Sequence, residues 1–161
     1  MLFYLAGSIE YSPDLGKGWR AEVTPLLQSL GHSVYDPAED EQKNLTDTEV
    51  REFRSWKKND LPRFQQTIRK IIAYDLDRIE HQCDAIICYW DRHAGRGAGT
   101  QGALTFAHRL GIPGYLICGM PVDEISGWLL GCAAEVFTDF EDFREFAGRR
   151  LAGEMAKQES A

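Results

Sequence analysis

The residues best placed to do chemistry form a glycine-rich loop, residues 92–99, which reads Arg-His-Ala-Gly-Arg-Gly-Ala-Gly. Its glycines, Gly97 and Gly99 among them, let the backbone turn sharply and approach a ligand closely. Thr100 stands at the expected start of a helix, where free N–H groups and the helix dipole favour an anion. No Gly-Lys-Ser/Thr follows, so this is not a Walker loop. The loop is either a plain turn or a cradle for phosphate or sugar, and its place after a strand favours the cradle.

Several neighbouring side chains could complete such a site. Asp91 directly follows an apolar strand and either points into a ligand crevice or caps the turn. Arg96 in the loop and Arg20 in the first predicted helix could each give a phosphate a charge-assisted hydrogen bond, although Arg20 could equally be a surface residue. His93 is the only histidine in the loop. Trp19 lies near the predicted site, with core packing as its default role.

The sequence carries no pattern of metal ligands and no nucleophile elbow. Its four histidines are scattered, and its four cysteines form no CxxC pair. No serine or cysteine stands in the setting of a nucleophile elbow. We therefore expect no metal and no cofactor, and cysteines that are reduced and pack as small hydrophobes.

Short apolar strands alternate with amphipathic helices along the chain. Strands are expected at 2–6, 32–35, 85–90, 114–117 and 135–137, and helices at 19–30, 63–82, 100–110 and 124–130 and from Asp139 to about 156. This pattern predicts one α/β domain over residues 1–161, a doubly wound, five-stranded, mainly parallel sheet flanked by helices, of flavodoxin-like or Rossmann-like type. Residues 38–62 are expected to be a polar helical insertion that begins at a capping box, Thr46 with Glu49, and residues 157–161 a flexible tail.

Composition limits the class of partner. The net charge of -7 disfavours duplex nucleic acid and anionic membranes, because both need a positive field. A small anion remains possible, since one arginine and a helix N-terminus can hold a phosphate. No stretch approaches the ~20 apolar residues of a membrane span, and the apolar N-terminus has no basic leader. We expect a cytoplasmic protein whose partner is a small molecule.

Three stretches, taken in order, resemble the nucleoside 2-deoxyribosyltransferase family, which includes nucleotide N-glycoside hydrolases. They are residues 4–8 (Tyr-Leu-Ala-Gly-Ser), residues 75–87 and residues 99–107 (Gly-Thr-Gln-Gly-Ala-Leu-Thr-Phe-Ala). The resemblance implies cleavage of the bond between a nucleobase and C1′ of its sugar. In that family a glutamate attacks C1′, the base leaves, and water or a second base takes the sugar from the glycosyl-enzyme. The logic is that of retaining glycoside cleavage.

The same resemblance suggests roles for individual residues. It implies that Asp75 is the family's catalytic aspartate and Tyr4 its first-strand tyrosine, although spacing alone would make Asp75 a solvated residue and Tyr4 a core residue. It implies further that base, sugar or 5′-phosphate is held by Gly7, Ser8, Ile9, Gly97, Gly99 and Thr100. A homodimer or higher homo-oligomer is also implied, and residues 128–130 (Trp-Leu-Leu) are a plausible contact.

One position departs from the family pattern, which has Gly-Thr, two residues, and then the nucleophilic glutamate. This chain has Ala103 there, and a methyl group cannot attack C1′. Either an engineered change or a natural loss of catalysis explains the difference, and we favour the engineered change because the other motif positions are kept. Asp91 or Glu80 acting as a substitute nucleophile is the weaker explanation.

Two other functions remain open at this point. One is a nucleotide-sensing module of the same fold without chemistry. The other is a cytokinin-type phosphoribohydrolase, which would have Pro-Gly-Gly before Gly-Thr, whereas residues 95–100 read Gly-Arg-Gly-Ala-Gly-Thr. The leading hypothesis is an inactive form of an N-glycosidase or transferase acting on a nucleoside or its 5′-monophosphate.

Overall fold

A parallel sheet of five strands forms the centre of the molecule. In the computed structural model, which describes residues 1–40 and 42–152, the strands are β1 (Leu2–Ala6), β2 (Ser33–Tyr35), β3 (Ala85–Trp90), β4 (Gly114–Cys118) and β5 (Glu135–Phe137). They lie in the order β2-β1-β3-β4-β5, and every neighbouring pair is parallel. This is the flavodoxin-like order, and it confirms the predicted doubly wound α/β fold.

The strand order places a ligand crevice between β1 and β3. From β1 the chain crosses to β2 on one side and then returns to β3 on the other side. The carboxyl ends of these two central strands therefore lead into loops that run in opposite directions. Such a topological switch point is where doubly wound sheets bind ligands.

The helices follow the expected alternation. They are α1 (Lys17–Ser29), α2 (Asp47–Asn59), α3 (Leu61–His81), α4 (Gly99–Leu110), α5 (Gly127–Cys132) and α6 (Phe140–Phe146), the last continuing into a π-helical turn, Ala147–Leu151. The helix expected at 124–130 begins later, because residues 122–124 form a 3-10 turn and Ser126 caps α5. Asp139 caps α6 by accepting the N–H of Asp142. The predicted helix end near 156 and the tail at 157–161 lie outside the described residues.

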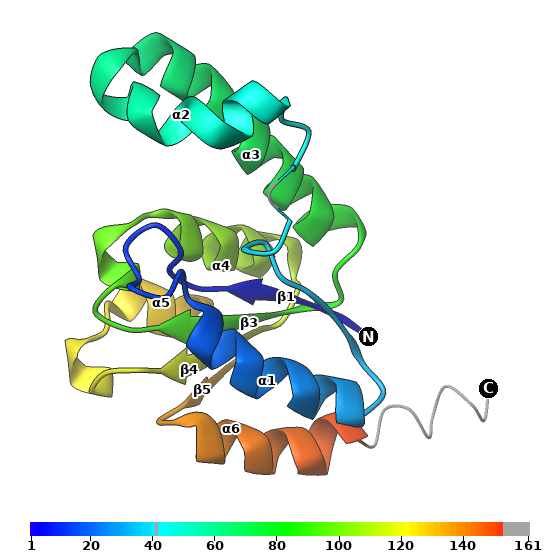
Figure 1. The fold of residues 1–161 in the computed structure, drawn as a ribbon. Coiled ribbons are helices and arrows are strands. Elements are labelled where there is room, and N and C mark those ends of the chain that lie inside the picture. The colour runs from blue at the N-terminus through cyan, green and yellow to red at the C-terminus, as the bar shows by residue number, and fades with distance from the viewer. Residues whose placement is uncertain (41, 153–161) are drawn as a thin grey trace.

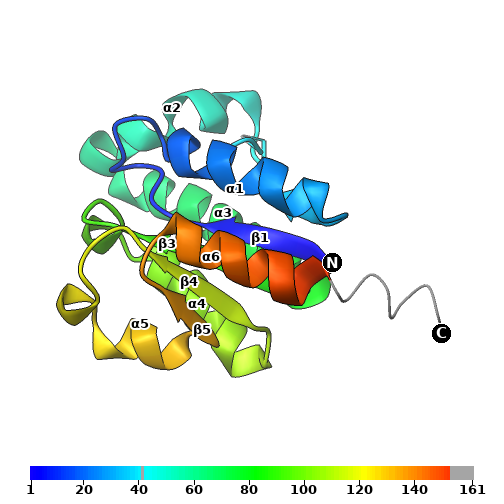
Figure 2. The ribbon, with the colours of Figure 1, turned by 90° about the horizontal axis from the view of Figure 1, so that it is seen from below.

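Helices cover both faces of the sheet. Figures 1 and 2 show α3, α4 and α5 on one face and α1 and α6 on the other. Alternate residues of β3 point to opposite faces of the sheet. Ile86 and Cys88 pack under α3 and α4, and Ile87 packs against α1 and α6. Because both faces are buried, β3 is apolar throughout instead of alternating with polar residues.

Within the predicted polar segment, α2 forms a helical hairpin with α3. Figure 1 shows α2 and the first half of α3 standing out from the sheet. The predicted capping box is present, since Thr46 and Glu49 satisfy each other's backbone N–H groups. Trp56 is buried, and the Arg63 guanidinium lies 3.7 Å from the centroid of its ring. Among the described residues, no helix combines the length and the apolar character that crossing a membrane requires.

Candidate functional site

A large pocket of about 1000 Å³ opens at the carboxyl ends of β1 and β3. Its floor is the end of β1 and the loop that follows, residues 4–11. One wall is α3, and the other is residues 94–109, which include the start of α4. Apolar side chains contribute much of the lining: Ile68, Ile71, Ile72, Leu76, Ile79, Phe106 and Trp128. The pocket is therefore far larger than the site of one buried water, and it lies at the predicted edge of the sheet.

The loop after β1 is held in place by α1. Trp19 packs so closely under Gly7 that a Cβ on that glycine would lie 2.6 Å from the indole Cζ2. Arg20 is only 2% exposed, and its guanidinium donates to the carbonyl oxygens of Leu5, Gly7 and Gly16. These contacts fix the backbone of residues 7–9 along the floor of the pocket.

Asp75 brings a carboxylate into the wall that α3 forms. Both of its oxygens accept hydrogen bonds from Lys43 Nζ, at 2.8 and 2.9 Å. The two side chains are 19% and 8% exposed, so this ion pair is largely shielded from water. Burial raises the pKa of Asp75, and the Lys43 ammonium group opposes that rise. The carboxylate is thus a fixed hydrogen-bond acceptor beside the pocket.

Tyr4 offers a hydroxyl group from the floor of the pocket. The residue is 4% exposed and lines the cavity. Burial, with the charge of Asp75 second, holds the pKa of Tyr4 well above its usual value. The phenol therefore stays protonated at neutral pH and can donate a hydrogen bond to a ligand.

A polar network braces the far side of Asp75. Asp40 accepts hydrogen bonds from the hydroxyls of Tyr35 and Tyr74. Burial acts to raise the pKa of Asp40, but these two hydrogen bonds, together with the backbone N–H and the charge of Lys43, outweigh it and the pKa is lowered. Arg78 in turn donates to the Tyr74 hydroxyl. The network ties the loop after β2 to α3 and so fixes the segment that carries Lys43.

The glycine-rich loop leads into an uncapped helix start. Residues 94–96 form a 3-10 turn, and α4 begins at Gly99 after Ala98, with no side chain capping it among the described residues. The first N–H groups of α4 are thus open to an anion at the pocket wall. Thr100 is buried in this turn and also lines the pocket.

Ala103 lies one turn further along α4, in the same wall. It is 8% exposed, and it faces the space between α3 and α4. The charged residues that line the pocket are Glu10, Asp75 and Arg109. None of these carboxylates stands on α4 near the position of Ala103.

Structural comparison relates this architecture to known enzymes. A 2-deoxyribosyltransferase from Bacillus psychrosaccharolyticus matches with a TM-score of 0.63 at 22% sequence identity, over 89% of this chain and 90% of that one. A 2-deoxyribosyltransferase from Leishmania mexicana matches with a TM-score of 0.57 at 19% identity, over 92% and 97%. The chain has the 2-deoxyribosyltransferase fold. No family model matches the sequence, and no curated protein matches it either.

The structure divides the predicted site residues into groups. One set lines the large pocket of this 2-deoxyribosyltransferase fold: Tyr4, Gly7, Ser8, Ile9, Asp75, Gly97, Gly99, Thr100 and Ala103. A second set, Trp19, Asp91 and His93, lines a smaller pocket instead. Since neighbouring strand residues point to opposite faces, Asp91 turns away from the side on which Trp90 packs under α4. Its Oδ1 accepts the N–H groups of His93 and Ala94, which is the turn-capping alternative.

The two arginines predicted to reach a phosphate contact other groups of the protein. Arg20 is buried, its Nε lies 2.9 Å from Asp36 Oδ1, and its remaining donors hold backbone carbonyls. Arg96 is exposed, and its guanidinium lies 4.9 Å from the centroid of the Tyr11 ring. Neither lines the large pocket. The expectation for Arg20 failed because the β1–α1 loop needs an internal donor for its carbonyl groups.

Two features of the site were not predicted from the sequence. Lys43 reaches Asp75 from a loop in which Lys43 and Asn44 both have positive φ, and nothing in that polar stretch signals an inward-facing lysine. The second feature is the apolar stripe of α3, because helical spacing puts its residues on one face without telling what that face covers. Ile68, Ile71 and Ile72 form pocket wall, and Ile72 is 50% exposed.

Proposed function

We propose that the large pocket binds a nucleoside or nucleoside 5′-monophosphate, and that its chemistry is the N-glycosidic cleavage class with the nucleophile missing. The observation that carries this proposal is Ala103 in the pocket wall, one turn into α4. That is the position at which the resemblance places the attacking glutamate. A chain with a methyl group there holds its ligand without breaking the bond at C1′.

The lining suits the parts of such a ligand. The apolar side chains of α3 and α4 offer surfaces on which a nucleobase can pack. Tyr4 can donate to a sugar oxygen, and Asp75 can accept from a sugar hydroxyl or a base N–H group. The open N–H groups at Gly99 and Thr100 suit a sugar oxygen or a 5′-phosphate.

Within residues 1–40 and 42–152, no other carboxylate takes the place of the glutamate. Both oxygens of Asp75 accept from Lys43, which leaves the carboxylate a poor nucleophile. Glu10 is exposed and paired with Lys57. Asp91 and Glu80 do not line the pocket, which argues against either as a substitute nucleophile.

The test restores the carboxylate. The Ala103→Glu variant is incubated with a panel of 2′-deoxynucleosides, ribonucleosides and their 5′-monophosphates, and free base is measured by chromatography. We expect base release from at least one panel member by Ala103→Glu and none by the unmodified chain. Ala103→Gln is the matched control, because it has the same shape without a nucleophile, and it should release no base.

The second candidate function, a nucleotide-sensing module, predicts a different outcome. It is favoured because both carboxylates that line the pocket in the described part of the chain, Asp75 and Glu10, are paired with lysines. Under it, the unmodified chain and Ala103→Glu both bind a panel member in calorimetry, and neither releases base. If neither protein binds any panel member while both remain folded, both functions are refuted.

A further inference from the structure

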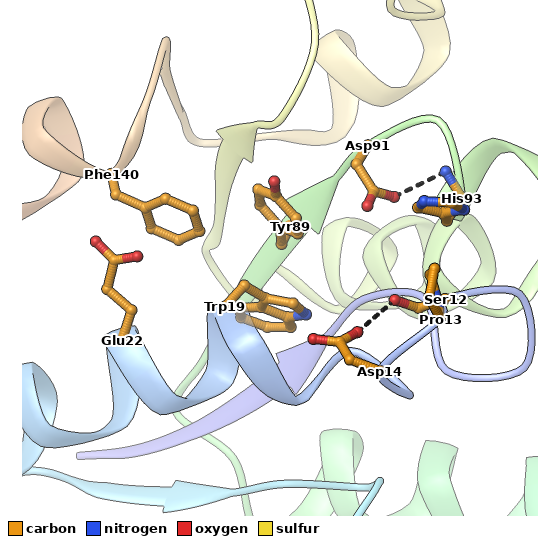
Figure 3. A pocket seen from close by; sticks show the side chains of 9 residues that line it. All are labelled: Ser12, Pro13, Asp14, Trp19, Glu22, Tyr89, Asp91, His93 and Phe140. Atoms are coloured by element: carbon orange, nitrogen blue, oxygen red, sulfur yellow. Dashed lines mark hydrogen bonds between the residues drawn. The ribbon is translucent and has the colours of Figure 1, made fainter.

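A second pocket, of about 320 Å³, lies on the other side of the loops that frame the large one. Figure 3 shows the residues that line it: Ser12, Pro13, Asp14, Trp19, Glu22, Tyr89, Asp91, His93 and Phe140. None of them lines the large pocket. Residues 12–14 and 8–11 belong to one loop, and residues 91–93 and 94–98 to another. One part of each loop thus lines the small pocket, and the other part lines the large pocket.

The charge of the small pocket is negative. Asp14, Glu22 and Asp91 line it, and no lysine or arginine of the described residues does. Hydrogen bonds from the Ser12 hydroxyl and from the Gly18 backbone lower the pKa of Asp14 to about 2, so this carboxylate is charged at neutral pH.

The three carboxylates act on one point. The pKa of Tyr89 is raised first by burial and then by the charges of Asp91, Glu22 and Asp14. All three negative charges are therefore close enough to act on the Tyr89 hydroxyl, and all three residues line the same pocket as Tyr89. A net charge of -7 for the whole chain adds to the attraction for a cation.

Two of the carboxylates, Asp91 and Glu22, keep capacity to accept further hydrogen bonds. Asp91 uses Oδ1 for two backbone N–H groups, and no hydrogen bond of the described residues reaches its Oδ2. Glu22 contacts Arg144 through Oε1 in a pair whose side chains are 43% and 45% exposed, and such a pair is weak in water. A cation inside the pocket can therefore gain new partners without breaking a buried ion pair.

Aromatic rings form the apolar wall. Trp19 and Tyr89 have centroids 5.5 Å apart, and Tyr89 and Phe140 have centroids 5.1 Å apart. Arg20 already lies 4.6 Å from the Trp19 centroid, so a ligand in the pocket meets mainly Tyr89 and Phe140. Rings beside carboxylates attract organic cations, which combine a positive charge with carbon surface.

A buried hydrogen-bond donor without an acceptor indicates that the ligand also carries an oxygen. Trp19 is 7% exposed, and its indole Nε1 has no hydrogen-bond partner among the described residues. Figure 3 shows the nitrogen edge of this indole turned towards Asp14 and Pro13. A ligand that brings an oxygen to this edge would satisfy the indole N–H group.

We propose that the small pocket binds a small organic cation that also carries a hydroxyl group, an amino alcohol in chemical class. Its ammonium group lies among the carboxylates of Asp14, Glu22 and Asp91, and its carbon atoms pack on Tyr89 and Phe140. This site is separate from the large pocket and does not rest on the function proposed there. Because both pockets share their loops, the cation contacts the segments that line the nucleoside site.

The test is an NMR titration of the ¹⁵N-labelled full chain with choline. Its matched control ligand is 3,3-dimethylbutan-1-ol, which has the same shape without the charge, and sodium chloride holds the ionic strength constant. We expect choline to shift the Trp19 indole signal, identified with a Trp19→Phe variant, and the backbone signals of Tyr89 and His93, in a saturable way. The neutral alcohol should leave these signals unchanged.

Charge variants complete the design. Glu22→Gln should weaken choline binding about threefold, the size expected for one partly exposed charge contact. Glu80→Gln removes an exposed carboxylate from α3 on the other face of the sheet and should leave choline affinity unchanged. The proposal is overturned if choline and the neutral alcohol shift the same signals equally, if no signal around the small pocket moves, or if the two variants bind choline alike.

Discussion

Replacing Lys43 by methionine removes the ammonium group that neutralises Asp75 beside the large pocket. Lys43 Nζ lies 2.8 Å from Oδ1 and 2.9 Å from Oδ2, and the two side chains are 8% and 19% exposed. Methionine is flexible and close to lysine in length, so it fills the same path without the charge. The variant therefore leaves the Asp75 carboxylate largely buried and unpaired.

Breaking a buried ion pair from one side costs about 3–5 kcal/mol when the remaining charge is wholly buried. Asp75 keeps some contact with water and can take up a proton, so we expect a loss of about 2–3 kcal/mol at pH 7. In a chain of this size each kcal/mol lowers Tm by about 2–4 °C, which gives a fall of roughly 4–12 °C.

The pH dependence has a definite sign. Burial raises the pKa of Asp75 even with Lys43 in place, and removing Lys43 raises it further. A carboxyl group whose pKa is higher in the folded state adds stability below its unfolded pKa and loses it as pH rises through the folded pKa. The deficit of Lys43→Met relative to the unmodified chain should therefore shrink as pH falls from 7 towards 5.

Urea unfolding at pH 5 and pH 7 measures both effects. Lys57→Met is the matched control, because Lys57 Nζ also lies 2.9 Å from a carboxylate, that of Glu10, but the two side chains are 45% and 52% exposed. It should lose less than about 1 kcal/mol. The reasoning is refuted if both variants lose the same stability, or if the Lys43→Met deficit stays constant with pH.

Three further changes test other parts of the structure. Gly7→Ala should lower the free energy of unfolding, measured by calorimetry, by about 2 kcal/mol, because its Cβ would lie 2.6 Å from Trp19 Cζ2. Gly99→Ala should lower it by less, because a Cβ there meets open space, and equal losses would contradict the packing. Thr46→Ala removes the capping box and should lower the free energy of unfolding by about 1 kcal/mol and speed hydrogen exchange in α2. Unchanged exchange in α2 would contradict a stabilising role of the cap. We predict a homo-oligomer by light scattering, shifted towards monomer in Trp128→Ser, since Trp128 is 61% exposed; a monomeric parent chain would contradict this.

The strands could be predicted because local pattern determines them. The apolar run from Ala85 to Trp90 and the three-residue strand at 135–137 both appear with the predicted bounds. The helix caps at Thr46 and Asp139 could also be predicted, because a single side chain determines each cap. The start of α5 was misplaced, since residues 122–124 satisfy their backbone as a 3-10 turn instead.

The site was only partly predictable, because sequence position does not give side-chain direction. Asp91 follows an apolar strand as expected, but the alternation of strand residues turns it to the face opposite the large pocket. Arg20 lies in the N-terminal turn of α1, as expected, but its guanidinium donates to carbonyl groups of the β1–α1 loop. The Lys43–Asp75 pair joins residues 32 positions apart, and only the folded chain brings them together.

The central claim is that the large pocket binds a nucleoside or its monophosphate and leaves it intact because residue 103 is alanine. NMR titration of the unmodified ¹⁵N-labelled chain with the nucleoside and 5′-monophosphate panel, followed by chromatography of the same samples, tests both halves. The claim predicts saturable shifts at Gly99, Thr100 and Ala103, with no free base. Absence of shifts at these residues for every panel member, or release of base by the unmodified chain, would contradict it.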